Sequence, residues 1–345
     1  MSAASPPAAP GIGIGLYPTR PAGEIVRLGV RAEALGYDRV WILDSPVIWR
    51  ELWVLLGALG ARTERVRLGC AVTSALTRQL AVTASAALSL AELTHGRFAL
   101  GLGTGDSAAA TTGGKPQTLA ELRATTAELR ALLAGGAALL ASGASRVEVR
   151  LRWAGDIAVP LYVAASGPRM LELAGELADG VIMMVGVRPE MVRAAIERVH
   201  AGAARAGRDP TVVELVLWTA CAASDHSPAE AIEAVKANVA RAAIRRLPLP
   251  VASCDAARLD AIRAGYDYGH HSQPGAPHAR LVSDALVAEF AVAGTTEACA
   301  AQLAALGELG LHEITLAVPD AAFDDREAVL ARARAAARRA FGVGG

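Results

Sequence analysis

The stretch RFALGLG (97–103) decides how we interpret the fold of this chain. After Arg97 it is apolar at every position that is not glycine, and such continuous runs are typical of strands covered on both faces. It leads into the polar turn TGDS (104–107), and a helical pattern follows at 118–134. A buried strand followed by a helix is the repeating unit of α/β folds.

The same unit recurs on both sides of this stretch. The other strands are predicted at 11–16, 39–43, 66–72, 160–165, 180–185, 213–220 and 312–318. The other helices are predicted at 21–36, 50–62, 79–93, 167–178, 189–206, 228–246, 295–309 and 324–340. Eight repeats favour closure into a (β/α)₈ TIM barrel over an open, doubly wound sheet.

Two segments break the rhythm, at 135–159 and 247–293. Each is too short to build a core of its own, so we expect insertions on one domain spanning 11–345. The first insertion holds the alternating run VEVRLRW (147–153), which predicts a small β excursion. Residues 1–10 lack the features of a signal peptide and are expected to be a disordered tail.

Composition limits the possible partners. Lys plus Arg (34) equals Asp plus Glu (34), so no basic excess is available for nucleic acid or an acidic membrane surface. No apolar run is long enough to span a bilayer. Four cysteines without CxxC spacing suggest neither a disulfide framework nor a zinc site, so we expect a cytoplasmic protein with a small-molecule partner and no metal.

In a barrel of this kind, the carboxyl ends of the strands meet at one rim, where active sites lie. Asp44 follows the second strand, and its carboxylate could bind a ligand or cap the next turn. GLGTGDS (101–107) follows the fourth strand, and its glycines would let a ligand approach the backbone. Its spacing does not match a dinucleotide fingerprint; a methyltransferase loop and a plain turn remain alternatives.

The stretch ASGPRM (165–170) follows the fifth strand and predicts a phosphate site. Ser166 can cap the next helix and Pro168 suits its first turn. The amides of Gly167, Arg169 and Met170 are then free for an anion, although an ordinary strand-to-helix turn would look the same. In the second insertion, the spacing of His270, His271 and His278 indicates a lid or surface loop, not a metal site.

Together these residues resemble the bacterial luciferase-like flavin and deazaflavin oxidoreductases, most closely the branch that uses coenzyme F420 and includes methylenetetrahydromethanopterin reductase. The resemblance runs through GYDRVWILD (36–44), LGCAVTSALTRQLAVTASA (68–86), GRFALGLGTGDS (96–107), PLYVAASGPRMLELAGELADGVI (160–182) and FAVAGTTE (290–297). It implies an F420-dependent oxidoreductase that transfers a hydride between C5 of the deazaflavin and an imine, activated alkene or alcohol. An FMN-dependent monooxygenase and a non-catalytic flavin-binding barrel are the alternatives, and a homodimer is expected.

The resemblance also implies roles for individual residues. Asp44 would lie beside the deazaflavin ring and orient it, and Asp106 would handle a proton, with a pKa raised by desolvation. A bulge with a non-prolyl cis peptide would back the ring. The implied cofactor-binding residues are Asp44, Cys70, Ala71, Val72, Thr73, Gly103, Thr104, Gly105, Ser166, Gly167, Arg169 and Met170.

Two positions depart from the family pattern. Ser45 stands where the sugar-phosphate enzymes of this branch have histidine, and Gly15 stands where the methanopterin reductases have glutamate. These changes remove the proton donors that the resemblance would otherwise imply. The cofactor half of the site is therefore expected to be retained, and the substrate half to differ.

Overall fold

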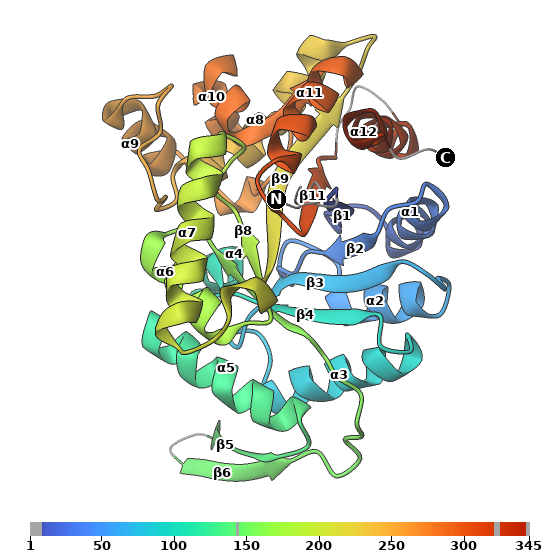
Figure 1. The fold of residues 1–345 in the computed structure, drawn as a ribbon, viewed down its shortest axis with the longest axis vertical. Coiled ribbons are helices and arrows are strands. Elements are labelled where there is room, and N and C mark those ends of the chain that lie inside the picture. The colour runs from blue at the N-terminus through green and yellow to red at the C-terminus, as the bar shows by residue number, and fades with distance from the viewer. Residues whose placement is uncertain (1–8, 143–144, 321–324, 343–345) are drawn as a thin grey trace, which may run out of the picture.

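Eight parallel strands close into a barrel in a computed structural model that describes residues 9–142, 145–320 and 325–342 (Figure 1). The last barrel strand pairs with the first, and the sixth pairs with the seventh, so the sheet has no break. The TIM-barrel prediction is confirmed. The barrel strands are β1 (Gly11–Leu16), β2 (Arg39–Ile42), β3 (Arg67–Thr73), β4 (Phe98–Leu102), β7 (Leu161–Ala165), β8 (Gly180–Met183), β9 (Glu214–Ala223) and β11 (Glu313–Val318).

Helices follow the strands and cover the outside of the barrel. Each buries an apolar stripe: in the first, Ile25, Leu28 and Ala32 recur at helical spacing and are buried. Sequence also sets where helices start, as in the capping box that Thr118 forms with Glu121. The covering helices are α1 (Ala22–Ala34), α2 (Leu52–Gly60), α3 (Leu80–Leu93), α5 (Leu119–Leu133), α6 (Pro168–Leu177), α7 (Pro189–Arg205), α8 (Pro228–Ala243), α11 (Thr296–Gly307) and α12 (Arg326–Phe341).

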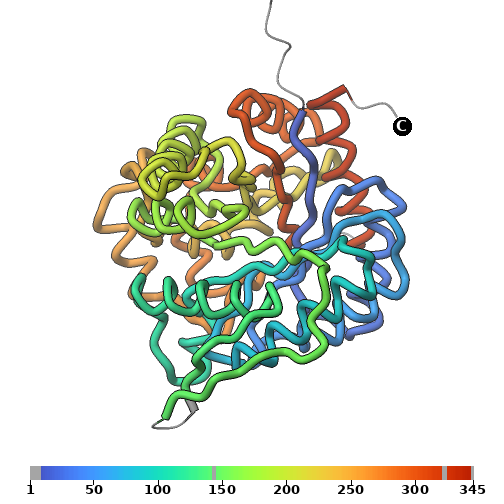
Figure 2. Tube along the Cα trace, turned by 60° about the horizontal axis from the view of Figure 1, so that its bottom comes forward, coloured from blue at the N-terminus to red at the C-terminus, as the bar shows by residue number. Residues whose placement is uncertain are grey.

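The first insertion forms a β-hairpin. Strands β5 (Ala137–Ser142) and β6 (Ser145–Arg150) pair antiparallel, so the predicted excursion is present but starts earlier and ends earlier than 147–153. The hairpin extends away from the barrel (Figure 2). It lies far from the rim at the carboxyl ends of the strands. The reason is that it follows the carboxyl end of α5, at the amino-terminal end of the barrel.

The second insertion packs over that rim. It contains α9 (Ala256–Ala264), α10 (Asp284–Phe290) and two short 3₁₀ turns, Tyr268–His270 and Pro277–Leu281. It ends in a strand that the sequence did not predict, β10 (Ala291–Gly294), which pairs in parallel with the carboxyl-terminal part of β9. The four residues of β10 lie outside the strand–helix repeat that indicates the other strands. The expectation that residues 11–345 form one domain stays a prediction. So does the expectation that residues 1–10 are a disordered tail, of which residues 1–8 lie outside the described residues.

Large side chains fill the barrel interior, and three of them lie beside a glycine of another strand. A Cβ added to Gly69 would lie 2.2 Å from the ring of Trp41, and one added to Gly180 would lie 2.2 Å from Tyr162. Gly15 likewise faces Trp218, at 2.5 Å. These glycines make room for aromatic rings, so the interior is a packed core and not a channel.

The amino-terminal end of the barrel is closed by a buried charge pair. Arg39 lies 3.4 Å from Glu313, and both side chains are almost fully buried. The Arg39 guanidinium lies 4.9 Å from the centre of the Trp41 ring, and Trp41 Nε1 donates a hydrogen bond of 2.7 Å to Glu313. Ligand access is therefore through the opposite, carboxyl-terminal end.

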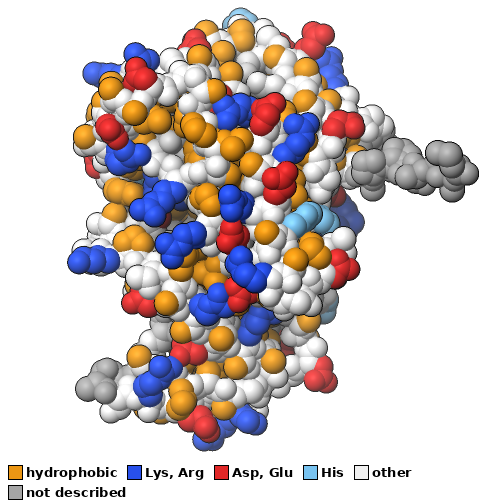
Figure 3. All heavy atoms as spheres, turned by 60° about the vertical axis from the view of Figure 1, so that its left-hand side comes forward, with side chains coloured by type: hydrophobic (Ala, Val, Ile, Leu, Met, Phe, Trp, Pro, Cys, Tyr) orange, Lys and Arg blue, Asp and Glu red, His pale blue; other side chains and the backbone are white. Residues whose placement is uncertain are grey.

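The outer surface over α5, α6 and α7 mixes charges of both signs with apolar patches (Figure 3). Several of its arginines pair with glutamates, such as Arg123 with Glu176 and Arg198 with Glu172. Among the described residues, no helix combines the length and apolar character needed to cross a membrane.

Candidate active site

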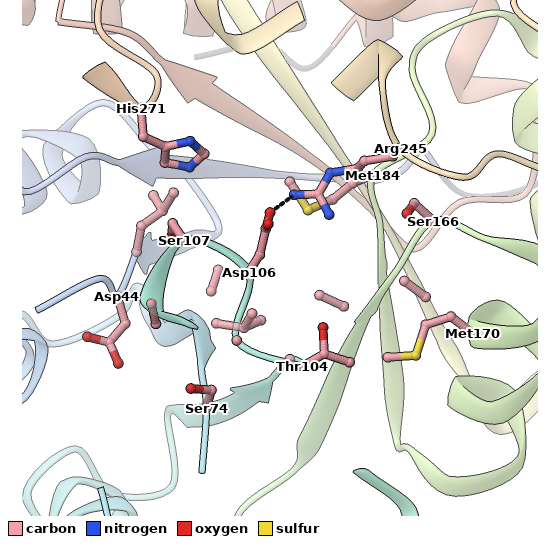
Figure 4. Close-up of a pocket in the computed structure, with 18 of the residues that line it drawn as sticks. Asp44, Ser74, Thr104, Asp106, Ser107, Ser166, Met170, Met184, Arg245 and His271 are labelled. Carbon is pink, nitrogen blue, oxygen red and sulfur yellow. Dashed lines mark hydrogen bonds and ion pairs between the residues drawn. The ribbon is translucent and has the colours of Figure 1, made fainter. Parts of the chain in front are cut away.

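A cavity of about 170 Å³ lies at the carboxyl ends of the barrel strands (Figure 4). It brings together turns that follow β2, β3, β4 and β7, and the second insertion adds His271. Nine of the residues singled out in the sequence line it: Asp44, Ala71, Val72, Gly103, Thr104, Gly105, Asp106, Ser166 and Met170.

A bulge in β3 forms one wall of this cavity. The pairing of β3 with β4 shifts between Cys70 and Thr73, and the Ala71–Val72 peptide bond is cis, as the resemblance implies. Cys70 itself lies behind the bulge, where its thiol donates to the carbonyl of Gly101 at 3.1 Å. Burial raises the pKa of Cys70 to about 12, so this thiol stays protonated.

The glycines of β4 fit this bulge. A Cβ on Gly101 would lie 2.1 Å from the carbonyl oxygen of Cys70, and one on Gly103 would lie 2.6 Å from Val72. Gly105 has a φ of +92°, a left-handed conformation that favours glycine. Gly101 and Gly103 thus leave space for the neighbouring bulge. The sequence analysis instead expected these glycines to let a ligand approach the backbone.

Asp44 is held by its own neighbours. Thr73 Oγ1 donates to its Oδ2 at 2.7 Å, and Arg78 contacts both carboxylate oxygens, at 2.5 and 3.3 Å. Arg78 also pairs with Glu51 at 2.7 Å. The Thr73 hydroxyl is therefore directed at Asp44, and Ser74 faces the cavity instead. Ser74 Oγ is buried and has no hydrogen-bond partner in the described part of the chain, so it is free for a ligand.

Asp106 starts α4 (Asp106–Thr112), a short helix that the sequence did not predict. Its Oδ2 accepts hydrogen bonds of 2.9 Å from Arg241 and Arg245, and its Oδ1 accepts one of 2.8 Å from Tyr268. Burial alone would raise the pKa of Asp106, but the charges of Arg245 and Arg241 outweigh it and hold the pKa well below the ordinary value. The expectation of a raised pKa is wrong, because the sequence did not reveal the two arginines.

The start of α6 offers backbone amides to an anion. Gly167 is the N-cap residue, and no side chain caps the helix, so the prediction that Ser166 is the cap is wrong. Ser166 lines the cavity instead. With Pro168 in the first turn, the amides of Arg169 and Met170 have no side-chain partner, which suits phosphate binding.

An open groove of about 1000 Å³ continues from the cavity past this helix end. Thr104, Asp106, Ser166 and Met170 border both spaces. Gly167 and Arg169, which do not border the cavity, line the groove. Three further arginines line it as well: Arg241, Arg245 and Arg246.

His271 reaches the cavity from the second insertion, and Figure 4 shows its ring directed into it. Its ring centre lies 5.5 Å from that of Trp49, and its Nδ1 lies 2.5 Å from the hydroxyl of Tyr266. Burial, together with the charges of Arg241 and Arg245, lowers the pKa of His271 to about 3, so the imidazole is neutral at physiological pH. Sequence reasoning placed this histidine in a lid or loop, because only the folded insertion distinguishes it from His270.

A second, smaller cavity of about 60 Å³ adjoins the first. The two share four residues: Leu43, Met184, Arg245 and His271. Trp218, Phe290, Tyr17 and Asn238 are among the other residues that enclose it. Asn238 Nδ2 donates to the Tyr17 hydroxyl at 2.7 Å, and Asn238 Oδ1 is buried with no partner in the part of the chain that the structure describes.

The two departures from the family pattern have visible consequences. Trp218 fills the space beside Gly15, so no side chain fits there. Ser45 is fully buried, and its hydroxyl has no hydrogen-bond partner among the described residues. Neither position can supply a proton to the cavity.

The comparisons with known proteins agree with this geometry. Residues 7–313 match the family model described as luciferase-like monooxygenase. The chain belongs to the luciferase-like monooxygenase family. Within this family it is 33% identical to a 5,10-methylenetetrahydromethanopterin reductase from Methanolobus tindarius over 314 residues, 89% of this chain and 94% of that protein.

Two solved structures share the luciferase-like fold of this chain. The coenzyme F420-dependent tetrahydromethanopterin reductase from Methanopyrus kandleri superposes with a TM-score of 0.73 at 23% identity, covering 95% of this chain and 98% of that one. An F420-dependent secondary alcohol dehydrogenase in complex with an F420–acetone adduct superposes with a TM-score of 0.75 at 21% identity, covering 94% and 99%.

Proposed function

We propose that this protein is an F420-dependent oxidoreductase that transfers a hydride between C5 of the deazaflavin and a small organic substrate. The relatives support this proposal, and so does one observation on the site. The groove beyond the α6 amino terminus is lined by four arginines: Arg169, Arg241, Arg245 and Arg246. F420 carries a tail with carboxylates beyond its phosphate, whereas FMN ends at the phosphate, so a basic groove that continues past the phosphate position favours F420.

The residues present fit such a cofactor. The β3 bulge at Ala71 and Val72 would support the ring, and the free Ser74 hydroxyl would hydrogen-bond a polar atom of it. The amides of Arg169 and Met170 would hold the phosphate. When bound, the deazaflavin supplies a hydride donor or acceptor at C5. The protein's part is to place that carbon against the substrate and to keep water out.

The two aspartates have supporting roles in this proposal. Asp44 holds Thr73 and Arg78 and so fixes the turn after β3, beside the ring position. Asp106 stays ionised and holds Arg241 and Arg245 in place, so it positions these arginines and does not donate a proton.

Titration with F420 and with FMN tests the proposal, with F420 fluorescence or protein fluorescence as the readout. We expect F420 to bind more tightly than FMN. Replacing Arg169 and Arg246 with glutamine should weaken F420 binding about tenfold or more, because each removes a cation from the groove, and should change FMN binding less. The control is Arg193→Gln, on the exposed face of α7. Equal or tighter binding of FMN would favour a flavin monooxygenase, and binding of neither would favour a non-catalytic barrel.

We also propose a cytoplasmic homodimer. Its support is indirect: the cysteines are free, which suits a reducing compartment, and apolar side chains are exposed on the neighbouring helices α2 and α3. Val54 on α2 is 65% exposed, and Val82 on α3 is 56% exposed.

A further inference from the structure

The boundary between the two cavities combines apolar and polar side chains. Leu43 and Met184 provide the apolar part, and His271 and Arg245 provide the polar part. The larger cavity contains the bulge that would back a cofactor ring, so a substrate in the smaller cavity would meet that ring at this boundary. The atom of the substrate that gains or loses charge would then lie beside His271 and Arg245.

His271 is arranged to donate a hydrogen bond from Nε2. The Tyr266 hydroxyl lies 2.5 Å from Nδ1, and a tyrosine that donates to Nδ1 leaves the proton of the neutral ring on Nε2. Nε2 has no hydrogen-bond partner among the residues that the structure describes, and the ring borders both cavities. A neutral imidazole N–H is a suitable electrophile for a polarised double bond.

The charges at the boundary favour a negative charge on the substrate. Arg241 and Arg245 share one carboxylate, that of Asp106, within the described part of the chain. Arg245 Nε is buried and lacks a partner there. One positive charge is thus left without a counterion beside the two cavities, where low polarity strengthens its effect.

This charge distinguishes two kinds of hydride acceptor. An imine accepts a hydride readily only as its protonated, cationic form, which the surplus positive charge would repel. A carbonyl group develops negative charge on oxygen as the hydride adds, and the same charge would stabilise it.

We propose that the substrate is a small ketone or aldehyde, or the corresponding alcohol, and that His271 Nε2–H and Arg245 form the site that stabilises its oxygen. The inference rests on the proposed F420-dependent function. In the reductive direction the carbonyl carbon accepts a hydride with its electron pair from C5 of the reduced cofactor, which is thereby oxidised. The π electron pair moves to oxygen, and after the hydride transfer the oxygen takes a proton from solvent water as the product leaves the site, which gives the alcohol. Asn238 Oδ1, at the far side of the smaller cavity, would accept a hydrogen bond from a hydroxyl or N–H group elsewhere on a substrate that carries one.

Rapid mixing of the protein, loaded with reduced F420, with cyclopentanone or with the matched cyclic imine 1-pyrroline tests this inference. We expect cyclopentanone to oxidise the cofactor at least tenfold faster than 1-pyrroline at pH 7. His271→Leu should slow oxidation by the ketone about 100-fold, the usual loss for one donor of an oxyanion site. His271→Gln keeps an N–H donor and should recover part of the rate. His270→Ala, an exposed neighbour, is the control and should match the wild type.

A second readout does not depend on turnover. In ¹⁵N-histidine-labelled protein, which has seven histidines, the His271 signal is assigned by its loss in His271→Gln. It should show the neutral Nε2–H tautomer from pH 5 to 8 and shift when cyclopentanone is added. Faster reaction with the imine, a wild-type rate in His271→Leu, or neither turnover nor a shift with the ketone would overturn the inference while F420 binding stands. Failure of the wild type to bind F420 would instead reject the proposed function, and the inference with it.

Discussion

Asp106 accepts hydrogen bonds from Arg241, Arg245 and Tyr268, and these partners decide what its carboxylate can do. The same aspartate in a purely apolar pocket would have a raised pKa and could act as an acid. Here the arginines keep it ionised, and its energetic contribution is to neutralise part of their charge. The sequence around Asp106, after a glycine-rich turn, would be the same in an apolar pocket and in a pocket lined with arginines, so it does not distinguish the two.

Asp106→Asn should therefore destabilise the protein. The substitution keeps the size of the side chain but leaves two largely buried guanidinium groups without a counterion, at a cost of about 3 kcal/mol in the free energy of unfolding at pH 7. Urea denaturation measures this cost. Asp156→Asn, at an exposed aspartate in the first insertion, is the control and should change stability little.

The difference in the free energy of unfolding between wild type and Asp106→Asn should depend on pH. The folded-state pKa of Asp106 lies below the unfolded value of about 3.9, so its contribution to stability is complete above that value. The contribution is lost as the pH falls from about 4 through the folded-state pKa. The difference between wild type and Asp106→Asn should thus be constant from pH 5 to 8 and shrink below pH 4. A stability difference that grows below pH 4 would contradict the lowered pKa of Asp106.

Residue identities at the rim could be predicted better than their contacts. Asp44, the bulge and the start of α6 lie where strand order and the resemblance put them. The partners of these residues come from distant parts of the chain: Arg241 and Arg245 from α8 and the turn after it, and His271 from the second insertion. A sequence pattern does not specify such long-range pairs, so it does not indicate that His271 reaches the site. Nor does it show that the Thr73 hydroxyl is directed at Asp44 and that Ser74 faces the cavity.

At the scale of elements, apolar side chains such as Leu286 and Phe290 pack the second insertion against α8, and polar contacts join its outer part to the rim. Tyr268 donates to Asp106 at the rim, and Glu289 pairs at 3.5 Å with Arg188 at the start of α7. The insertion is joined to the barrel at β10, which adds to β9. Its outer part therefore depends on contacts to the rim itself.

Tyr268→Phe should loosen this part of the insertion without unfolding the barrel. The hydrogen bond goes to a charged acceptor and is worth about 1.5–3 kcal/mol, so amide exchange over 266–279 should accelerate about tenfold. Hydrogen–deuterium exchange with mass spectrometry measures this, and the β5–β6 hairpin provides an internal reference that should not change. Equal acceleration in both regions would indicate general destabilisation instead of local opening.

Elements of the strand–helix repeat were predicted well, and short elements outside it were not. The barrel strands and their covering helices each carry an apolar run or stripe that faces the core, and the repeat indicates even the four-residue strands β2 and β8. β10 and α4, with four and seven residues, lie outside the repeat, and each depends on tertiary pairing or on the left-handed turn at Gly105 for its start. Local propensity alone is too weak to indicate elements of this length.

For the whole molecule, the exposed valines of α2 and α3 allow a test of association. We expect the wild type to be a dimer and the double variant Val54→Asp, Val82→Glu to be a monomer, because burying two carboxylates at an apolar interface is unfavourable. Analytical ultracentrifugation measures the mass. Val212→Glu, at a valine that is 60% exposed elsewhere, is the control. A double variant with the same mass as the wild type would place the interface on another face.

The contact of Gly15 with Trp218 also constrains how this protein could have diverged. Glutamate at position 15, which the resemblance to the methanopterin reductases would imply, would collide with the indole ring, and a smaller residue at 218 alone would leave a void beside a bare glycine. Each change is therefore harmful by itself and tolerated together with the other, so the two positions should show strong epistasis. An engineered glutamate at position 15 should accordingly be accepted only when a smaller residue is placed at position 218 as well.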